Sequence, residues 1–436
     1  MGAVGVHRVL ALCRHLVGQG GRVTIVTQRP RVGDLLDESL LVRVPENLTV
    51  VRCLTPDLPS LARRLLKRSS RQSGVSDHGQ AGIKKQAVSA PLGLLKRIID
   101  WLSWWLQIPD SRTGWLIPAV WAGWKQARRR RPDVIFATAP VWTGLLAAAI
   151  LARLLRVPLV ADFRDPWHGS LFKRIPYRAH QRANALLERM VVNTAARITC
   201  AWDGIRRLMV ERYPKRTNHI RTVLNGFEPE QIDPVVSVRL DENRFVLLHT
   251  GSLYGPRNPM GLLEGLKLLA HDCPDEAQRI LVVFLGLTTY HSRPIAELAE
   301  AHGVSRQVRV ISPVPHKQAM AFLKGADVAI LLGQSGGEKL ASIPAKAYEY
   351  IGARKDVLAI GSGDEVCEVM RRGGCRIWRS PDDPNDIAKT LRKVLDHNIQ
   401  NNGSEKTDLS ERHTLTRSRM AEELGSILQI AIADRR

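Results

Sequence analysis

The sequence predicts an α/β protein of two domains, each built from a parallel sheet with helices on its faces. The chain has 436 residues, which is long for a single domain. Short apolar segments of strand length alternate with segments whose apolar residues recur at helical spacing. The alternation runs through two sets that join near residues 225–240, and such alternation is typical of parallel sheets.

The first elements predicted are a helix over Val9–Leu16 and a strand over residues 23–27. A glycine-rich stretch with Gly2 and Gly5 precedes the helix. A doubly wound domain normally begins with a strand and places its glycine-rich turn after that strand. Because no strand precedes Gly2, we expect that Met1 is not the true start, or that the chain lacks one β-strand.

Residues 56–131 are predicted to be an insertion into the first domain. Residues 56–90 are basic and rich in Ser, Gly and Gln, which predicts a flexible loop. Six of the ten tryptophans lie between residues 101 and 124, with basic residues on both sides. Tryptophan with basic flanks is typical of a helix at a membrane interface. A core helix with a solvated basic end is the alternative that the sequence leaves open.

The alternation of strands and helices continues from residue 134. The predicted first domain has strands at 134–137, 159–161 and 198–201, and helices at 143–155, 183–192 and 204–213. The second has strands at 245–249, 280–285, 308–310, 328–332, 356–360 and 377–378, and helices at 260–270, 295–302, 317–324, 366–372 and 387–397. We therefore expect domains at 1–228 and 229–405, and a final helix within 406–436 that crosses back to the first domain.

The composition narrows the class of protein and its partners. Hydrophobic residues make up 44% of the chain, and the net charge is +22. Such a charge favours anionic partners, namely nucleic acid, an anionic membrane surface or phosphorylated substrates. The six cysteines are scattered without a CxxC pair, so neither a disulfide framework nor a structural zinc site is expected. No apolar run approaches the ~20 residues that span a bilayer, so we expect a soluble or peripheral protein.

Polar loops follow two strands of the predicted second domain, where open α/β sheets bind ligands. After the first strand, Gly251 and Ser252 lead to Arg257, whose planar guanidinium suits a diphosphate. Before the strand at 356–360, a helix begins after Pro344 and carries Lys346 and Glu349. Helix N-terminal amides and an ammonium group suit phosphate, and a carboxylate can accept hydrogen bonds from the two hydroxyls of a ribose.

A third polar loop, Asp162-Phe163-Arg164-Asp165-Pro166-Trp167, follows a strand of the first domain. We expect Asp165 to bind an acceptor hydroxyl or orient a sugar, and Arg164 to neutralise phosphate. A network between Arg164 and Asp165 that only shapes the loop is the alternative.

These segments resemble those of retaining, family-4-type (bacterial group 1) glycosyltransferases of the GT-B fold. Glu349 corresponds to the family's nucleotide-proximal glutamate, and Arg257 takes the lysine position of its Gly-x-x-x-x-x-Lys phosphate clamp. Ser252 and Ala341 stand where the family often has a second basic residue and a first glutamate. The broader family often has a His-Asp pair where this chain has Arg164 and Asp165. Gly2 and Gly5 resemble the family's glycine-rich loop beneath the phosphate.

The resemblance implies two Rossmann-like domains that face a cleft, and transfer of a sugar from a nucleotide-sugar donor to an acceptor hydroxyl with retention of configuration. It further implies a hexosyl or N-acetylhexosaminyl transferase that needs neither metal nor cofactor. The sequence agrees, because it has no Asp-x-Asp pair. The donor would be held by Gly251, Ser252, Arg257, Pro344, Lys346 and Glu349, with Gly2 and Gly5, and the catalytic candidates are Asp165 and Arg164.

The tryptophan-rich segment favours an acceptor at the membrane face, such as a lipid-linked saccharide in polysaccharide biosynthesis. The protein would then be cytoplasmic and peripheral at the inner membrane face. A nucleotide-sugar epimerase of the same fold and a catalytically degenerate basic binding protein are the alternatives. Nucleic-acid binding is supported by charge alone, since no helix-turn-helix, zinc-finger or aromatic RNA-binding pattern occurs, and no nucleic-acid partner is expected.

Overall fold

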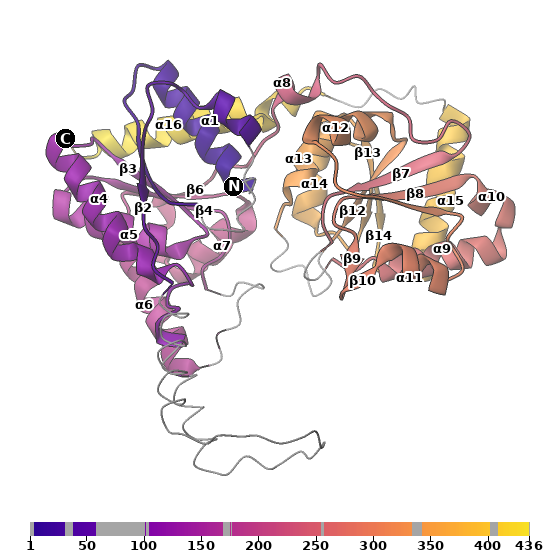
Figure 1. Cartoon of the computed structure of the whole chain (residues 1–436), viewed down its shortest axis with the longest axis horizontal. Helices are drawn as coiled ribbons and strands as arrows, with labels where there is room; N and C mark the ends of the chain where they lie inside the picture. The colour runs from indigo at the N-terminus through magenta and orange to yellow at the C-terminus, as the bar shows by residue number, and fades with distance from the viewer. Residues whose placement is uncertain are drawn as a thin grey trace, which may run out of the picture. The chain divides into compact units, whose positions relative to one another are not determined.

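The computed structural model describes residues 4–30, 38–57, 101, 104–168, 175, 177–253, 257–333, 342–401 and 409–435 (Figure 1). The chain divides into two compact units. Unit 1 consists of Met1–Ala201, Ile205–Thr222 and Leu424–Arg436, and unit 2 consists of Trp202–Gly204 and Val223–Glu423. The main division therefore falls six residues before the predicted boundary at residue 228, and the last residues of the chain belong to unit 1.

Two parallel sheets form the framework of the described part of unit 1. The larger sheet has the order β3-β4-β5-β6 and contains β3 (Ile135–Ala139), β4 (Leu159–Phe163), β5 (Arg197–Cys200) and β6 (Ile220–Thr222). In the smaller sheet, β1 (Thr24–Gln28) pairs with β2 (Thr49–Cys53). Every residue of β4 is buried, as expected for a central strand covered on both faces.

Helices connect and accompany these strands in unit 1. They are α1 (Val4–Gly18), α4 (Leu116–Arg129), α5 (Trp142–Leu155), α6 (Arg178–Thr194), α7 (Asp203–Arg212) from Ile205 on, and α16 (Arg417–Ala433) from Leu424 on, with 3-10 turns at Glu38–Arg43, Thr113–Trp115 and Pro214–His219. α5 is apolar on almost every side because it packs against α4, α6, β3 and β4. It ends at Arg156, whose φ of 50° is left-handed.

The first predicted elements are present in unit 1. α1 covers the predicted helix at Val9–Leu16, and β1 matches the predicted strand at 23–27 to within one residue. The predicted glycine-rich loop is wrong at Gly5, because this residue lies in the first turn of α1. Gly2 lies outside the described residues. Among the described strands, β1 pairs only with β2, and β3 only with β4; the expected strand before Gly2 stays a prediction.

Most of the predicted insertion at 56–131 lies outside the described residues, which omit 58–100, 102 and 103. Trp101, Trp104 and Trp105 are helical, and α4 carries the two last tryptophans of the cluster. α4 packs with β1, β2 and α5. It is therefore part of the fold of unit 1 and not an addition to its surface.

Unit 2 is built around one six-stranded parallel sheet with the order β11-β8-β7-β12-β13-β14. The strands are β7 (Phe245–Thr250), β8 (Ile280–Leu285), β11 (Val308–Ile311), β12 (Val328–Leu332), β13 (Asp356–Ile360) and β14 (Ile377–Ser380). β7, β8 and β12 are buried along their whole length. A two-residue antiparallel pair, β9 (Thr289–Tyr290) and β10 (Arg293–Pro294), lies outside this sheet.

The helices of unit 2 connect these strands and cover the sheet (Figure 1). They are α8 (Pro229–Ile232), α9 (Met260–Asp272), α10 (Pro274–Gln278), α11 (Ile295–Ala301), α12 (His316–Gly325), α13 (Ala345–Gly352), α14 (Asp364–Arg372) and α15 (Pro384–Asn401), with a 3-10 turn at Arg412–Leu415. α9, α11 and α15 share one core with β7, β8 and β12. The predicted fold class, α/β with parallel sheets in two parts, is confirmed.

Candidate active site

The strand order of unit 2 identifies the edge at which a ligand is expected. β7 and β12 are neighbours at the centre of the sheet, and the chain leaves them in opposite directions, β7 toward β8 and β12 toward β13. Ligands of open α/β sheets bind beyond the carboxyl ends of strands at such a switch point. Gly251, Ser252 and Arg257 follow β7, and α13, which comes after β12, carries Lys346 and Glu349.

The Lys346 side chain lies directly on the backbone of Gly251. A Cβ atom added at Gly251 would lie 2.6 Å from Lys346 Cε and 2.8 Å from Nζ, and the φ of Gly251 is +94°. A residue with a side chain is disfavoured here by both the backbone conformation and the lack of space. Gly286, after β8, has a φ of +131°, and its Cβ would lie 2.6 Å from the Gly251 carbonyl oxygen.

Two basic side chains come together at this edge. Arg257 is only 9% exposed. Burial, together with the charge of Arg257, lowers the pKa of Lys346 to about 7, while Glu349 acts in the opposite direction. A pKa this far below the usual lysine value makes the charge of the amine sensitive to nearby charged groups.

The buried imidazole of His249 in β7 contacts the same amine. Its Nε2 atom lies 3.2 Å from Lys346 Nζ, and its Nδ1 atom lies 3.2 Å from the carbonyl oxygen of Ile330 in β12. Burial and then the Lys346 charge hold the pKa of His249 well below its usual range. His249 is therefore neutral at physiological pH.

α13 is attached to the sheet through Tyr350. Its hydroxyl donates to the Ile330 carbonyl oxygen at 3.1 Å and lies 3.4 Å from the Thr250 backbone nitrogen. Burial raises the pKa of Tyr350 to about 12, so the donor proton stays in place. Pro344 precedes the helix with extended backbone angles. The positive end of α13 thus lies at the carboxyl edge of the sheet.

Glu349 lies one turn beyond Lys346 on α13. Its carboxylate is 25% exposed, and Oε1 lies 3.4 Å from Nε2 of His316 at the start of α12. The Glu349 carboxylate can accept further hydrogen bonds at this place. Together with Lys346 and Arg257 it forms a site with cations for a diphosphate and an acceptor for hydroxyl groups.

A second polar network lies at the carboxyl end of β4 in unit 1. Arg8 of α1 donates from Nε and Nη2 to the two oxygens of Asp162, at 3.0 and 2.9 Å. Thr138 and Thr199 donate to the same carboxylate at 2.7 and 2.6 Å. Burial acts to raise the pKa of Asp162, but the Arg8 charge and these hydrogen bonds outweigh it and lower the pKa.

Arg164 extends this network toward the start of α1. Its Nε donates to Thr138 Oγ1 at 3.0 Å, and its Nη2 donates to the Pro140 carbonyl oxygen at 3.0 Å. A Cβ atom on Gly5 would overlap the guanidinium, so a larger residue at this position would displace the Arg164 side chain. Asp165 follows; burial raises the pKa of Asp165, and the Arg164 charge opposes this.

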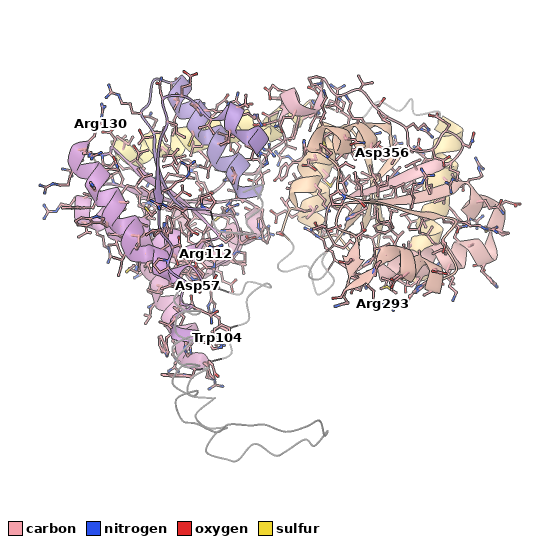
Figure 2. All side chains as sticks on the ribbon, viewed as in Figure 1. Asp57, Trp104, Arg112, Arg130, Arg293 and Asp356 are labelled. Atoms are coloured by element: carbon pink, nitrogen blue, oxygen red, sulfur yellow. The ribbon has the colours of Figure 1, made fainter. Side chains whose placement is uncertain are left out.

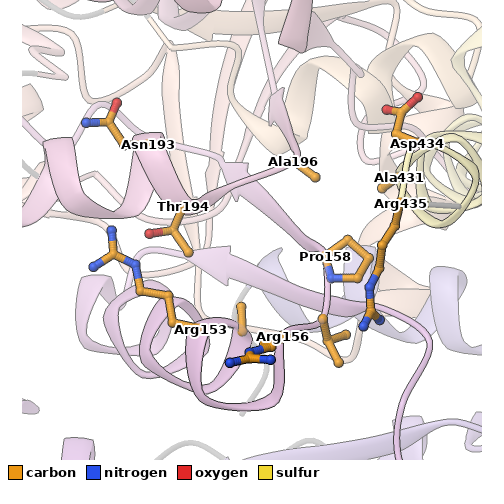
Figure 3. Close-up of a pocket in the computed structure, with 11 residues that line it drawn as sticks. Arg153, Arg156, Pro158, Asn193, Thr194, Ala196, Ala431, Asp434 and Arg435 are labelled. Atoms are coloured by element: carbon orange, nitrogen blue, oxygen red, sulfur yellow. The ribbon is translucent and has the colours of Figure 1, made fainter.

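A pocket of about 410 Å³ in unit 1 lies away from these residues (Figure 3). Val157, Pro158 and Ala196 line it, and they precede β4 and β5, so the pocket lies at the amino edge of the sheet. Arg153, Arg156 and Arg435 lie where α5 and α16 end. Guanidinium groups at helix C-termini offset the negative end of the helix dipole. These arginines therefore have a structural explanation, and the pocket is not part of the candidate active site.

Comparison with known proteins identifies the family. A model of the family "Glycosyl transferases group 1" matches residues 235–429, and a model of "Glycosyltransferase Family 4" matches residues 87–231. Together the two matches cover most of both units. The chain belongs to the group 1 glycosyltransferases of the GT-B fold.

Individual proteins that are similar to this chain, at low sequence identity, support the same family assignment. The D-inositol 3-phosphate glycosyltransferase 1 of Catenulispora acidiphila is 23% identical over 274 residues, which are 58% of this chain and 62% of that protein. The chain thus matches about three fifths of the length of this relative. A glycosyltransferase from Rickettsia africae shares the fold with a TM-score of 0.59 and 14% identity, over 99% of this chain and 96% of that chain. Anabaena HepE in complex with UDP and glucose has a TM-score of 0.59 and 12% identity, with coverages of 99% and 97%.

The structure brings together most of the residues that the sequence proposed for the donor site of this glycosyltransferase. Lys346 contacts Gly251, and Arg257 and Glu349 act on its pKa. Ser252 follows Gly251 directly. Ala341 lies outside the described residues, as do residues 254–256. In unit 1, the side chain of Arg164 donates to Thr138 and Pro140. The proposed roles of Arg164 and Asp165, and the alternative of a network between them that only shapes the loop, stay predictions.

Three side chains of the candidate site were not found from the sequence. His249 had a signal in the sequence, because it is a polar residue that follows four apolar residues and comes two residues before Gly251. Tyr350 and His316 had none, since their contacts depend on how α12 and α13 pack on the sheet.

The buried Arg8–Asp162 pair gives a prediction about stability. Replacing Arg8 by methionine leaves the Asp162 carboxylate buried without its cation, and we expect a loss of about 3–5 kcal/mol in the unfolding free energy of unit 1. Adding Asp162→Asn to this variant should restore part of the loss. Because folding lowers the pKa of Asp162, the pair stabilises above the unfolded pKa near ~4, and this contribution is lost as the pH falls through the folded pKa.

Urea unfolding followed by circular dichroism at several pH values measures these effects. Arg131→Met is the matched control in unit 1, because its hydrogen bonds to the Leu155 and Arg156 carbonyl oxygens are exposed and an ordinary hydrogen bond contributes only about 1 kcal/mol. A loss for Arg8→Met no larger than for this control would contradict the prediction.

Proposed function

We propose that the chain transfers a sugar from a nucleotide-sugar donor to an acceptor hydroxyl, and that unit 2 holds the donor at the carboxyl edge of β7 and β12. The observation that carries this proposal is the Lys346 amine, which lies on the Gly251 backbone beside the nearly buried Arg257. Paired cations in a partly dry site suit a diphosphate. HepE, a similar structure, is described in complex with UDP and glucose.

Each residue of the donor site has a role in this proposal. Arg257 and Lys346 contact the diphosphate, and the start of α13 after Pro344 adds backbone donors. Glu349 accepts hydrogen bonds from the ribose hydroxyls. In the transition state, negative charge develops on the leaving diphosphate, and the two cations stabilise it more strongly than the ground state.

On the acceptor side, we propose that unit 1 supplies Asp165 and Arg164. The guanidinium of Arg164 is fixed by Thr138 and the Pro140 carbonyl, so it presents a constant positive charge at the carboxyl end of β4. Asp165 binds the acceptor hydroxyl. Transfer proceeds with retention of configuration, moves a hexosyl or N-acetylhexosaminyl group, and uses no cofactor and no metal, so we expect full activity in EDTA.

Nucleotide binding is the first test of the donor site. We expect one of UDP, GDP and ADP to bind the wild-type protein and Glu349→Ala to weaken that binding about 10- to 100-fold, since a hydrogen bond to a charged group contributes about 1.5–3 kcal/mol. Isothermal titration calorimetry measures this.

Glu368→Ala is the matched control, because this glutamate is 63% exposed on α14 and pairs only with Arg371 among the described residues. Equal affinity of Glu349→Ala and wild type, or no binding of any of the three nucleotides to the folded protein, would contradict the donor site. Consumption of donor without acceptor, with release of an epimer, would identify an epimerase instead.

Our proposal for the class of acceptor rests on the outer face of α4. Ile117, Trp121, Trp124 and Arg128 recur at helical spacing and form one stripe, which we name the outer stripe. Ile117 is 79% exposed and Trp121 is 62% exposed. The opposite face packs through Ala119 on Trp115, Cys53 and Ala147.

The surroundings of the outer stripe are basic and aromatic. Trp121 stacks on Trp124, and the Arg128 guanidinium lies 5.3 Å from the centre of the Trp124 ring. Arg129 and Arg130 extend the positive charge beyond α4, where Figure 2 labels Arg130. Exposed tryptophan beside arginine suits the headgroup region of an anionic membrane. None of the described helices is both long and apolar enough to cross a bilayer.

We therefore propose that the acceptor is a lipid-linked saccharide used in polysaccharide biosynthesis, reached by peripheral contact of the outer stripe with the inner membrane face. Because α4 covers α5, deletion of the segment would expose the core, and point substitutions are the better test. We expect Ile117→Ser with Trp121→Ser to reduce binding to phosphatidylserine vesicles at least about tenfold, since each side chain loses about 1.5–3 kcal/mol of burial.

Vesicle co-sedimentation measures this, with nucleotide binding as the measure of an intact unit 2. Leu287→Ser is the matched control, because Leu287 is a 60% exposed apolar residue of unit 2. Equal co-sedimentation of the double variant and the wild type would exclude the outer stripe as the membrane contact.

A further inference from the structure

His249 is a polar residue in one of the fully buried strands of unit 2. All six residues of β7 are buried, and His249 itself is 1% exposed. Its ring lies 5.9 Å from the ring of Phe284 in β8. A buried polar group is costly unless it is hydrogen-bonded, and each ring nitrogen of His249 has one partner, the Ile330 carbonyl oxygen and the Lys346 amine.

These two partners determine where the imidazole proton lies. The Ile330 carbonyl can only accept, so Nδ1 carries the hydrogen and donates it at 3.2 Å. Nε2 then has a free lone pair and accepts from Lys346 Nζ at 3.2 Å. A neutral imidazole in this tautomer accepts from the Lys346 amine whether that amine is charged or uncharged.

The other groups that face Lys346 come from the loop after β7 and from α13. Arg257 adds positive charge, Glu349 adds negative charge, and the Tyr350 phenol stays protonated. Glu349 in turn contacts His316 of α12. A diphosphate would add negative charge beside the amine and so favour its protonated form.

We infer that His249 is a positioning residue of the diphosphate site, which holds the Lys346 amine on the Gly251 backbone while the amine gains a proton from solvent as the diphosphate binds. This inference rests on the proposed function, because it takes the ligand to be a nucleoside diphosphate. The step is balanced: one amine lone pair takes one proton from solvent, and no bond of the ligand changes. A charged imidazole in place of neutral His249 would repel the ammonium.

The direction in which diphosphate affinity changes with pH follows from the protonation state of Lys346 in the protein without ligand. With a Lys346 pKa of about 7, about nine tenths of the amine is uncharged near pH ~8 when no ligand is bound. Binding of a diphosphate at that pH takes up about 0.9 proton. Affinity then falls up to about tenfold per unit as the pH rises above ~7, and Lys346 contributes no pH dependence below about pH 6.

Calorimetry in Tris, Tricine and HEPES, which differ in ionisation enthalpy, measures the proton uptake. The probe is UDP near pH ~8, where its terminal phosphate is already ionised; GDP, ADP and inorganic pyrophosphate are run in the same buffers. We expect wild type to take up close to one proton and Lys346→Arg to take up almost none, since a guanidinium stays charged. Binding to wild type without uptake, or equal uptake in Lys346→Arg, would overturn the inference.

Two substitutions at His249 separate positioning from packing. His249→Gln places its amide near the Nε2 position and keeps an acceptor for Lys346. His249→Asn places its amide near Nδ1 and keeps only the Ile330 partner. We expect His249→Asn to weaken UDP binding about tenfold, as for a hydrogen bond to a charged group, and His249→Gln to stay within about threefold of wild type.

His302→Asn is the matched control, because Nδ1 of His302 also contacts a backbone carbonyl, that of Leu298 at 2.8 Å in α11. Equal losses for His249→Asn and His249→Gln, with both proteins folded by circular dichroism, would show a packing role and overturn the positioning role. The two proposals fail differently. If neither a nucleotide nor pyrophosphate binds wild type, both are overturned, whereas binding without proton uptake overturns only this one.

Discussion

Parallel pairing is the constraint on which both units depend, because it gathers the carboxyl ends of all strands of a sheet at one edge. In unit 2 the two central strands, β7 and β12, lead away in opposite directions, so the loop after β7 and the start of α13 meet there. Lys346 lies 95 residues after Gly251 in sequence, yet its amine lies on the glycine backbone. No local feature of either segment could produce this contact alone.

The two polar networks show different ways to keep charge inside a protein. In unit 1 the Arg8–Asp162 pair forms a closed network. Two threonines also donate hydrogen bonds to the carboxylate, and the pair is almost inaccessible to solvent. In unit 2 Lys346 has a neutral partner, His249, and charged neighbours of both signs, Arg257 and Glu349, and burial lowers its pKa. The closed network stabilises structure. In the network of unit 2, a bound anion would favour the charged form of the Lys346 amine.

The sequence predicted the elements well where apolar runs end at glycine or proline, as at β7, β12 and α13. It also placed Lys346 and Glu349 together, because residues three apart share a helix face. It could not predict contacts that depend on the register of distant strands, such as that of His249 with Lys346. For the tryptophan-rich segment it left two alternatives open, a membrane-interface helix and a core helix. One face of α4 belongs to the core and the outer stripe is exposed, while contact with a membrane stays a proposal.

Gly286 shows how a residue can matter to a site without touching a ligand. Its missing side chain leaves room for the Gly251 carbonyl, and its φ is also left-handed. Any larger residue would push against the backbone on which the Lys346 amine lies. If related sequences keep a glycine here through evolution, that constancy would reflect the space between two loops and not recognition of a substrate. A search for residues that select the donor sugar should therefore treat this position as part of the scaffold.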